Sequence, residues 1–198
     1  MAPSAAPSFS PEGSELIEFL MENSPHSEEQ RLDDPSSPQY LAFEWLAEDL
    51  RRTPDLSVRD KLSRYALVTL FYSTSGEYWA NKIGWLSHEG HGAICSWHGV
   101  ACNLSGNDFN VLSLSGNKLI AGKIPEEVGM LSVASLDLSE NQLTGSIPLM
   151  TLFAGNYSGI YSLESLLLGG NDLTGSIPAQ LTGLEVIRTL DLSQNKLE

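Results

Sequence analysis

The residues best suited to chemistry in this sequence lie in the segment HEGHGAIC, which contains His88, His91 and Cys95. His98 follows three residues later. Imidazole nitrogens and a thiolate bind Zn²⁺ in many proteins, so these groups would support metal-assisted chemistry if they converged on one ion. The same spacing also occurs in ordinary polar loops. We therefore expect no metal and no cofactor, and we keep a metal-dependent enzyme that uses His88 and His91 as an alternative hypothesis.

Other arrangements typical of enzymes are missing from the sequence. There is no nucleophile turn of the G-x-S-x-G type and no glycine-rich loop suited to holding a phosphate. Asp137 and Asp191 are carboxylates in similar surroundings, because each lies between two leucines in the phrases SLDL and TLDL. This equivalence indicates a repeated element rather than a pair of catalytic acids. We expect no catalytic residues and no enzymatic activity.

Asp137 and Asp191 belong to a repeated element. The frame L-x-L-x-x-N-x-L occurs four times in the sequence. Its asparagine is Asn117, Asn141, Asn171 and Asn195 in turn, at spacings of roughly 24, 30 and 24 residues. A period of this size predicts a solenoid, in which each coil stacks on its neighbours. The second copy is longer because it includes an insertion at residues 149–162.

Each residue type in the frame has a structural role. Alternate side chains of a strand face opposite ways, so the paired leucines should point into the coil. The asparagines should bond to backbone groups of adjacent coils that would otherwise be buried without partners. The glycines should permit a turn that a Cβ would obstruct, and the prolines fix φ where no donor is needed. These residues are the leucine pairs Leu112/Leu114, Leu136/Leu138, Leu166/Leu168 and Leu190/Leu192, the glycines Gly122, Gly145 and Gly175, and the prolines Pro125, Pro148 and Pro178.

The phrases NQLTGSIP and NDLTGSIP resemble the signature of plant-type leucine-rich repeats, which occur in receptor-kinase ectodomains and in inhibitors of pectin-degrading enzymes. The segment CSWHGVAC, preceded by Trp79 and Trp85, resembles the N-terminal cap of that subclass. The region before it is similar to leucine-rich-repeat proteins of diatoms. The resemblance implies an α/β solenoid with a helical cap that contains a Cys95–Cys102 disulfide, and hence an oxidising compartment.

The predicted function is recognition of a protein, a peptide or a glycan by the outward side chains of the strands, on the concave side of the solenoid. A receptor-like ectodomain, an inhibitor of an extracellular hydrolase and an array that binds nothing by itself are the alternatives. The outward side chains are mostly small and lack the aromatic and arginine residues that often dominate binding energy. We call this surface the strand face; it comprises Val111, Ser113, Ser115, Ser135, Asp137, Ser139, Ser165, Leu167, Gly169, Thr189, Asp191 and Ser193.

Three regions are expected along the chain. Residues 1–37 are rich in serine, proline and acidic residues, which is typical of a disordered tail, although the apolar cluster at residues 16–21 could form a brief helix. Residues 38–107 should form the helical cap and cover the first edge of the repeat sheet. Residues 108–198 contain about 3.5 repeats and no C-terminal cap.

Within the cap, two segments show the pattern of helices. The segment SPQYLAFEWLAEDLRR, at residues 37–52, places Leu41, Trp45 and Leu46 on one stripe. The segment at residues 57–76 begins with Ser57 in an N-capping arrangement. At the other end of the chain, the uncapped coil from Ile187 suggests a fragment of a longer protein. We expect this coil to fray from about Arg188 and to self-associate through Leu190, Leu192 and Leu197.

The charge of the chain is asymmetric. The net charge is −14, and the first 50 residues contain eleven acidic residues with Arg31 as the only base, a net of −10. Such a molecule repels nucleic acid and anionic lipid, so neither is expected as a partner. The sequence has no basic N-terminal region typical of a secretory signal and no apolar stretch of about 20 residues that would span a bilayer.

Two glycosylation sequons agree with the implied disulfide. They are NLS at Asn103 and NYS at Asn156. Together these features predict an extracellular or cell-surface protein. The missing signal conflicts with that location, and we reconcile the two by expecting a segment upstream of this chain or another export route.

Overall fold

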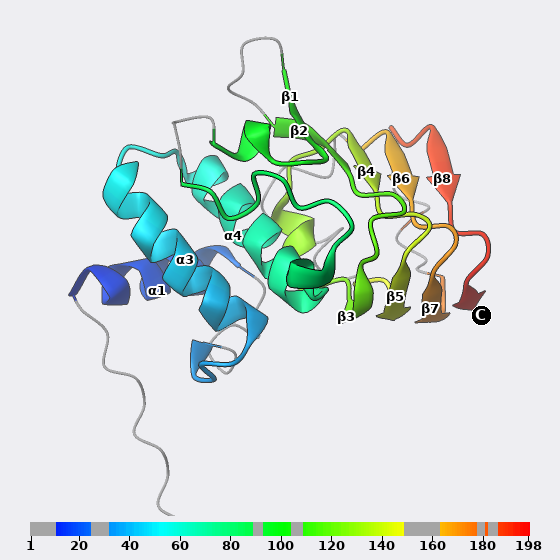
Figure 1. Cartoon of the computed structure of the whole chain (residues 1–198), viewed down its shortest axis with the longest axis horizontal. Helices are drawn as coiled ribbons and strands as arrows, with labels where there is room; N and C mark the ends of the chain where they lie inside the picture. Colours follow the sequence, from blue (N-terminus) through cyan, green and yellow to red (C-terminus); the bar gives the residue numbers. More distant parts are fainter. Residues whose placement is uncertain are drawn as a thin grey trace, which may run out of the picture.

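The chain folds into a block of helices followed by a stack of coils that leads to the C-terminus (Figure 1). The structure is a computed structural model, and it describes residues 11–24, 32–88, 93–103, 109–148, 163–177, 181 and 186–198. The helices occupy one end of the stack, so the first coil is covered on its outer side. This arrangement confirms an α/β solenoid with a helical N-terminal cap.

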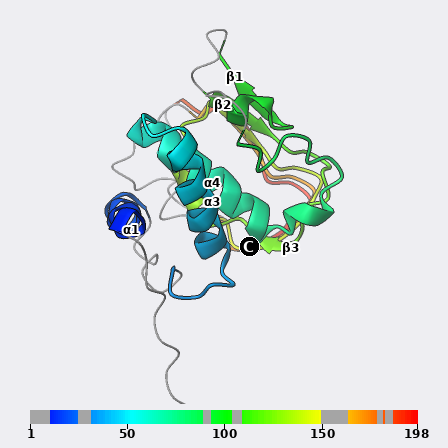
Figure 2. The same cartoon turned by 60° about the vertical axis from the view of Figure 1, so that its left-hand side comes forward.

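Helices α3 (Pro38–Arg52) and α4 (Val58–Ser73) form the main body of the cap. Each begins at a serine, because the Oγ atoms of Ser37 and Ser57 accept hydrogen bonds from backbone N–H groups of the first turn. The predicted N-cap at Ser57 is confirmed, and Ser37 is a second N-cap that the sequence analysis did not identify. Helix α4 buries almost its whole middle section, since it lies between α3 and the first coils (Figure 2).

Helix α1 (Pro11–Asn23) corrects the expectation of a disordered tail for the part of residues 1–37 that it occupies, where a brief helix was the alternative; residues 1–10 and 25–31 lie outside the described part of the chain. Leu16 and Leu20 of this helix are buried, and Ile17 and Phe19 pack against the same core. Figures 1 and 2 show α1 lying beside α3. A short helix is marginal in water by itself, but burial of an apolar stripe on α3 and α4 supplies the stabilisation that composition alone did not reveal.

The repeats form two parallel sheets, one on each side of the stack. The five-stranded sheet has the order β1-β2-β4-β6-β8, and the four-stranded sheet has the order β3-β5-β7-β9. Among the described strands, β1 alone runs antiparallel to its neighbour. The strands are β1 (Val100–Cys102), β2 (Phe109–Ser113), β3 (Ile120–Lys123), β4 (Ser135–Asp137), β5 (Gln142–Gly145), β6 (Ser165–Leu167), β7 (Asp172–Gly175), β8 (Thr189–Asp191) and β9 (Lys196–Leu197). Short 3-10 turns complete the structure: η1 (Gly76–Tyr78), η2 (Ala93–Ser96) and η3 (Glu126–Met130).

The sheet register agrees with the predicted repeat frame. Leu112 pairs with Leu136, Leu136 with Leu166, and Leu166 with Leu190. The first three leucines are at most 2% exposed, whereas Leu190 is 46% exposed. Each inner leucine has a coil on both sides, while Leu190 has a described coil on one side only. The last coil is therefore half covered, as its sequence predicts.

The four frame asparagines connect consecutive coils. Asn141 accepts a hydrogen bond from the backbone N–H of Leu119 at 3.0 Å and donates to the carbonyl of Leu114 at 2.9 Å, both in the preceding coil. Asn171 and Asn195 repeat this pattern one and two coils later. Buried backbone groups are thus satisfied by side chains at a fixed interval.

The ladder of asparagines begins inside the cap. Asn117 accepts a hydrogen bond from the backbone N–H of Asn81 at 2.7 Å and donates to the carbonyl of Asn81 at 2.9 Å. The segment around Asn81 therefore takes the place of a preceding coil. Cap and repeats are joined by the same type of contact that joins one repeat to the next.

The frame glycines serve two different purposes. Gly145 and Gly175 have φ angles of 76° and 83°, in the left-handed region that favours glycine, as the predicted turn requires. Gly122 corrects that expectation, because it has no positive φ. A Cβ at Gly122 would lie 2.1 Å from the carbonyl oxygen of Ser73 at the end of α4. Gly122 is needed for close contact between the first coil and the cap.

Candidate functional site

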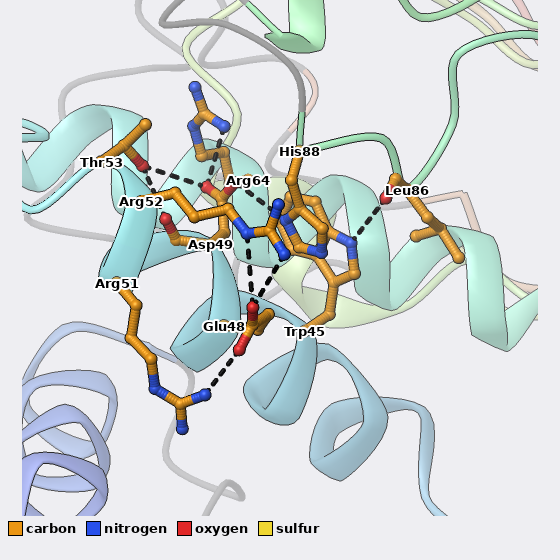
Figure 3. Close-up of polar contacts among 9 residues, drawn as sticks. All are labelled: Trp45, Glu48, Asp49, Arg51, Arg52, Thr53, Arg64, Leu86 and His88. Atoms are coloured by element: carbon orange, nitrogen blue, oxygen red, sulfur yellow. Dashed lines mark hydrogen bonds and ion pairs between the residues drawn. The ribbon is translucent and has the colours of Figure 1, made fainter.

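His88, a member of the candidate metal cluster, makes other contacts (Figure 3). The Nδ1 atom of His88 lies 3.1 Å from Oδ1 of Asp49, and its ring stacks on Trp45 with 4.7 Å between centroids. The indole Nε1 of Trp45 donates to the carbonyl of Leu86 at 3.0 Å. The side chain of His88 is only 18% exposed. His88 thus joins the loop before the disulfide to helix α3.

Asp49 is the centre of this contact, and its side chain is fully buried. Its Oδ2 atom accepts a hydrogen bond from Nη1 of Arg64 on α4 at 2.9 Å, and Arg64 is itself 2% exposed. Thr53 completes the cluster with a hydroxyl bond to the backbone carbonyl of Asp49 at 2.9 Å. A buried carboxylate is costly unless it is paired, so Asp49 holds α3, α4 and the His88 loop in one arrangement.

The other described members of the candidate metal cluster, Cys95 and His98, have contacts of their own. Cys95 forms a disulfide with Cys102, which confirms the pairing that the family resemblance implied and removes the thiolate from the set of metal ligands. His91 lies outside the described residues. The backbone of His98 bonds to Ile83 and to the indole of Trp85. Among the described residues, no three His, Cys, Asp or Glu side chains are grouped so that they could hold a metal ion.

The disulfide lies beside a buried aromatic cluster in the cap. Trp85 contacts Trp79, Trp97 and Phe71, with ring centroids 4.7 to 5.9 Å apart. Trp79 donates from its Nε1 to the carbonyl of Thr74 at 3.1 Å. These rings fill the space between α4 and the first strands. The tryptophans that marked the cap in the sequence are therefore core residues rather than binding residues.

The strand face is a continuous surface on the outer side of the five-stranded sheet. Ser113, Asp137, Leu167 and Asp191 stand next to one another on β2, β4, β6 and β8. Val111, Ser135, Ser165 and Thr189 form a second row. Neighbouring strands are about 4.8 Å apart, so each row presents side chains at that interval. Ser115, Ser139, Gly169 and Ser193 follow at the ends of the strands.

The two aspartates of the strand face are held by serines of the same coil. Ser139 donates to Oδ1 of Asp137 from its backbone N–H at 3.0 Å and from its hydroxyl at 2.6 Å. Ser193 makes the same two bonds to Oδ1 of Asp191, at 2.9 and 2.6 Å. The side-chain and backbone hydrogen bonds from Ser193 lower the pKa of Asp191 below its usual value. Both carboxylates are therefore oriented before any ligand arrives.

The chemical character of the strand face is that of a hydrogen-bond acceptor. Asp137 and Asp191 are its only charged residues, and no base occupies any of its positions. Hydroxyl groups fill most of the remaining places, with Ser115 and Ser139 bonded to each other at 2.9 Å. Gly169 is buried because the carboxylate of Asp191 lies over it, and a Cβ at Gly169 would be 2.8 Å from that group. Gly169 makes room for Asp191 and offers no side chain to a ligand.

Sequence reasoning missed the pairing of aspartate with serine on this face. The signal was present in the phrases DLS at Asp137 and Asp191, because aspartate often accepts a hydrogen bond from the backbone two residues later. A second missed feature is the residue before each frame asparagine, which has a positive φ. These residues are Gly116, Glu140, Gly170 and Gln194.

Of the two glycosylation sequons, the structure describes the one at Asn103 and not the one at Asn156. Asn103 follows strand β1, one residue after the disulfide, and its side chain is half-buried. Asn156 lies in the insertion at 149–162, and residues 149–162 are outside the described part of the chain. Glycosylation at either asparagine stays a prediction.

Comparison with known proteins gives the family. The leucine-rich-repeat pattern matches residues 132–151 and 162–184. Phytosulfokine receptor 1 from Arabidopsis thaliana is 40% identical to this chain over 68 residues. The chain contains leucine-rich repeats similar to those of a plant receptor. The aligned region covers 33% of this chain and 7% of phytosulfokine receptor 1, so this chain spans a small part of that relative.

Two solved structures are also similar to the leucine-rich-repeat protein. A plant ice-binding protein is 28% identical with a TM-score of 0.56, over 67% of this chain and 40% of that chain. The ectodomain of the receptor kinase SOBIR1 from Arabidopsis thaliana is 27% identical with a TM-score of 0.49, over 68% of this chain and 67% of that chain. In the described part of the chain, no helix is long and apolar enough to cross a membrane.

Proposed function

We propose that the leucine-rich-repeat protein is an extracellular recognition module without catalytic activity, and that its strand face binds a segment of another protein in an extended conformation. The observation that carries this proposal is the register of β2, β4, β6 and β8. It places two rows of outward side chains side by side over four coils. A surface with this regular spacing suits an extended chain that crosses the strands.

The chemistry of the strand face favours a ligand that donates hydrogen bonds. Asp137 and Asp191 are acceptors whose Oδ1 atoms are held by Ser139 and Ser193. The Oδ2 atom of Asp137 also accepts a hydrogen bond from the hydroxyl of Ser113 at 3.4 Å. Hydrogen bonds to a charged acceptor are stronger than those between neutral groups. Backbone N–H groups and the side chains of lysine and arginine are the natural partners in a protein ligand. A receptor-like ectodomain fits this proposal, because the phytosulfokine receptor is named as a receptor.

Selection from a random peptide library tests the proposal. Peptides selected on the natural chain should lose binding to Asp137→Lys and Asp191→Lys variants, which reverse charge on the strand face. They should keep binding to Asp55→Lys, which makes the same charge change at an exposed position after α3. Selected peptides that bind all three variants equally well would place recognition elsewhere. A set of selections that yields no binder would favour the hypothesis that this array binds nothing by itself.

Two narrower versions of recognition make different predictions. An inhibitor of an extracellular hydrolase should reduce the activity of pectin-degrading enzymes in a direct assay, whereas a receptor-like module should not. Glycan binding should appear as retention on immobilised wall polysaccharide that Asp137→Lys abolishes. Neither outcome is needed for the broader proposal.

Binding to ice is a second candidate, favoured by the similarity to a plant ice-binding protein. Thr144 of β5 and Thr174 of β7 have the same place in the repeated phrase LTGSIP and lie on the same four-stranded sheet, where the register sets Thr144 beside Asp172. The ion pair between Lys196 and Asp172 at 2.6 Å places charges on the same sheet. Thermal hysteresis that Thr174→Val leaves intact and Thr174→Lys removes would support this candidate, and its absence at millimolar protein would exclude it.

A further inference from the structure

A cavity of about 750 Å³ lies between helices α1 and α3, far in sequence from the strand face. Helix α3 contributes one side chain per turn or more: Tyr40, Phe43, Glu44, Ala47, Leu50 and Arg51. These positions recur every three or four residues, so they share one face of the helix. At 1.5 Å per residue they extend over roughly 16 Å, which matches four or five residues of an extended peptide. Cavities of this volume are typical of ligand sites.

The floor of the cavity is apolar. Leu16 of α1 and Phe43 of α3 are buried beneath it, and Ala47 and Leu50 are half-buried along its length. The ring of Tyr40 lies 6.1 Å from that of Phe43, so two aromatic rings meet at one end. Helix α1 contributes Glu12, Gly13, Glu15 and Leu16 to the lining. A ligand with apolar side chains would remove this surface from water.

The rim of the cavity has three acidic side chains and two basic ones, and both basic side chains already have partners. Glu12, Glu15 and Glu44 line it and are exposed, and within the described residues none of them forms an ion pair. Glu44 accepts a hydrogen bond from the side chain of Tyr40, and burial together with the charge of Glu44 raises the pKa of Tyr40. The two bases of the rim have partners in the chain itself. Arg51 pairs with Glu48, and the ammonium group of Lys61 lies 5.6 Å above the ring of Phe19. The net charge of −14 adds a field that attracts cations to the whole molecule.

We propose that the cavity between α1 and α3 binds a short basic segment of another protein, in which a lysine or arginine is flanked by apolar residues. The cationic group lies among Glu12, Glu15 and Glu44, where an aromatic face of Tyr40 is also within the site. The flanking apolar side chains lie on Phe43 and Leu50. This site is separate from the strand face and does not depend on the function proposed for it.

Calorimetric titration with one matched pair of peptides tests the proposal. The probe is the blocked peptide acetyl-Ala-Leu-Arg-Leu-Ala-amide, and the control replaces arginine by citrulline, which has the same shape without the charge. The arginine peptide should bind about tenfold more tightly, since a hydrogen bond to a charged group contributes more than a neutral one. Equal affinities, or no binding of the arginine peptide at millimolar concentration, would overturn the proposal.

Variants of the full chain locate the site. Glu15→Gln and Glu44→Gln should each weaken binding of the arginine peptide by up to about fivefold and leave the citrulline peptide unaffected. Glu18→Gln is the matched control, because Glu18 is an exposed residue of the same helix that does not line the cavity. Ala47→Phe should fill the cavity and weaken both peptides. If Glu18→Gln has the same effect as Glu15→Gln, the attraction is a property of the net charge and the site does not exist.

Discussion

The cap and the repeats of this leucine-rich-repeat protein are stabilised in two different ways. In the repeats, the same contacts recur in every coil: a buried leucine pair, an asparagine bonded to the preceding coil and a parallel strand. In the cap, each contact occurs once. Asp49, Arg64 and His88 form one buried cluster, and Trp79, Trp85 and Trp97 form one aromatic core.

This difference indicates where a substitution should reduce the stability of the fold most. A repeated contact has neighbours that make the same contact, so its loss weakens one coil and its borders. A single contact has no substitute within its own region. We therefore expect the largest effects in the cap, and the predictions below run from the largest to the smallest.

The buried ion pair of the cap should be the most sensitive point. Arg64→Ala leaves Asp49 as a buried carboxylate without its guanidinium partner, which should cost about 3–5 kcal/mol of unfolding free energy in urea. Glu48→Ala is the control, because its pairs with Arg51 and Arg52 are exposed and should contribute at most about 1 kcal/mol. Similar losses for both variants would mean that burial does not set the difference between cap and surface.

Loss of the disulfide should be the next largest effect. Cys95 and Cys102 are seven residues apart, and closure of so short a loop in the unfolded chain contributes about 2.5 kcal/mol. The Cys95→Ser/Cys102→Ser double variant should show this loss in urea unfolding. Dithiothreitol should reproduce it in the natural chain and have no effect on the variant. An unchanged stability on reduction would show that the cap is held by its aromatic core alone.

A ladder asparagine should matter less than the cap contacts but more than an exposed asparagine. Asn141→Ala removes hydrogen bonds to Leu119, Leu114 and Leu138, and it should cost about 1–3 kcal/mol by leaving buried backbone groups without partners. Asn110→Ala, at an exposed position of β2, should be nearly neutral. Equal effects of the two substitutions would show that the ladder does not hold the coils together.

The last coil should open more readily than the inner coils. The amide of Leu190 should exchange at least about tenfold faster than that of Leu166, a difference of about 1.4 kcal/mol, because only Leu166 has a coil on both sides. The same open edge should let the 198-residue chain associate as its concentration rises, which light scattering would detect. Equal protection of both amides in a strictly monomeric sample would contradict this prediction.

The smallest effect should come from the carboxylate of Asp191. Its folded pKa is lowered by Ser193, so this group adds stability above the ordinary aspartate pKa of about 3.9 and loses that contribution as the pH falls through the folded value. Ser193→Ala should raise the pKa of Asp191 towards the ordinary value in an NMR titration. Thr189→Ala, on the same strand, should leave it unchanged. A titration of Asp191 unaffected by Ser193→Ala would remove the argument that this carboxylate is oriented in advance.

The sequence by itself determined the repeats and the start of helix α4. The spacing of leucine and asparagine indicated the coil register, and Ser57 indicated the start of α4, because these features depend on contacts within a few residues or on a period that repeats. The resemblance in the cap also gave the disulfide. For the strand face, the sequence determined which side chains point outward but not that Asp137 and Asp191 are held by serines.

Only the tertiary structure decided the contacts between segments that are far apart and occur once. Asp49 contacts His88, which is 39 residues later in the sequence. Position 122 requires glycine because the end of α4 lies against it. Helix α1 is ordered by burial of Leu16 and Leu20, although the composition of its region is typical of disorder. Such contacts have no period and no local signal. They depend on the shape of the packed core, which short stretches of sequence do not encode.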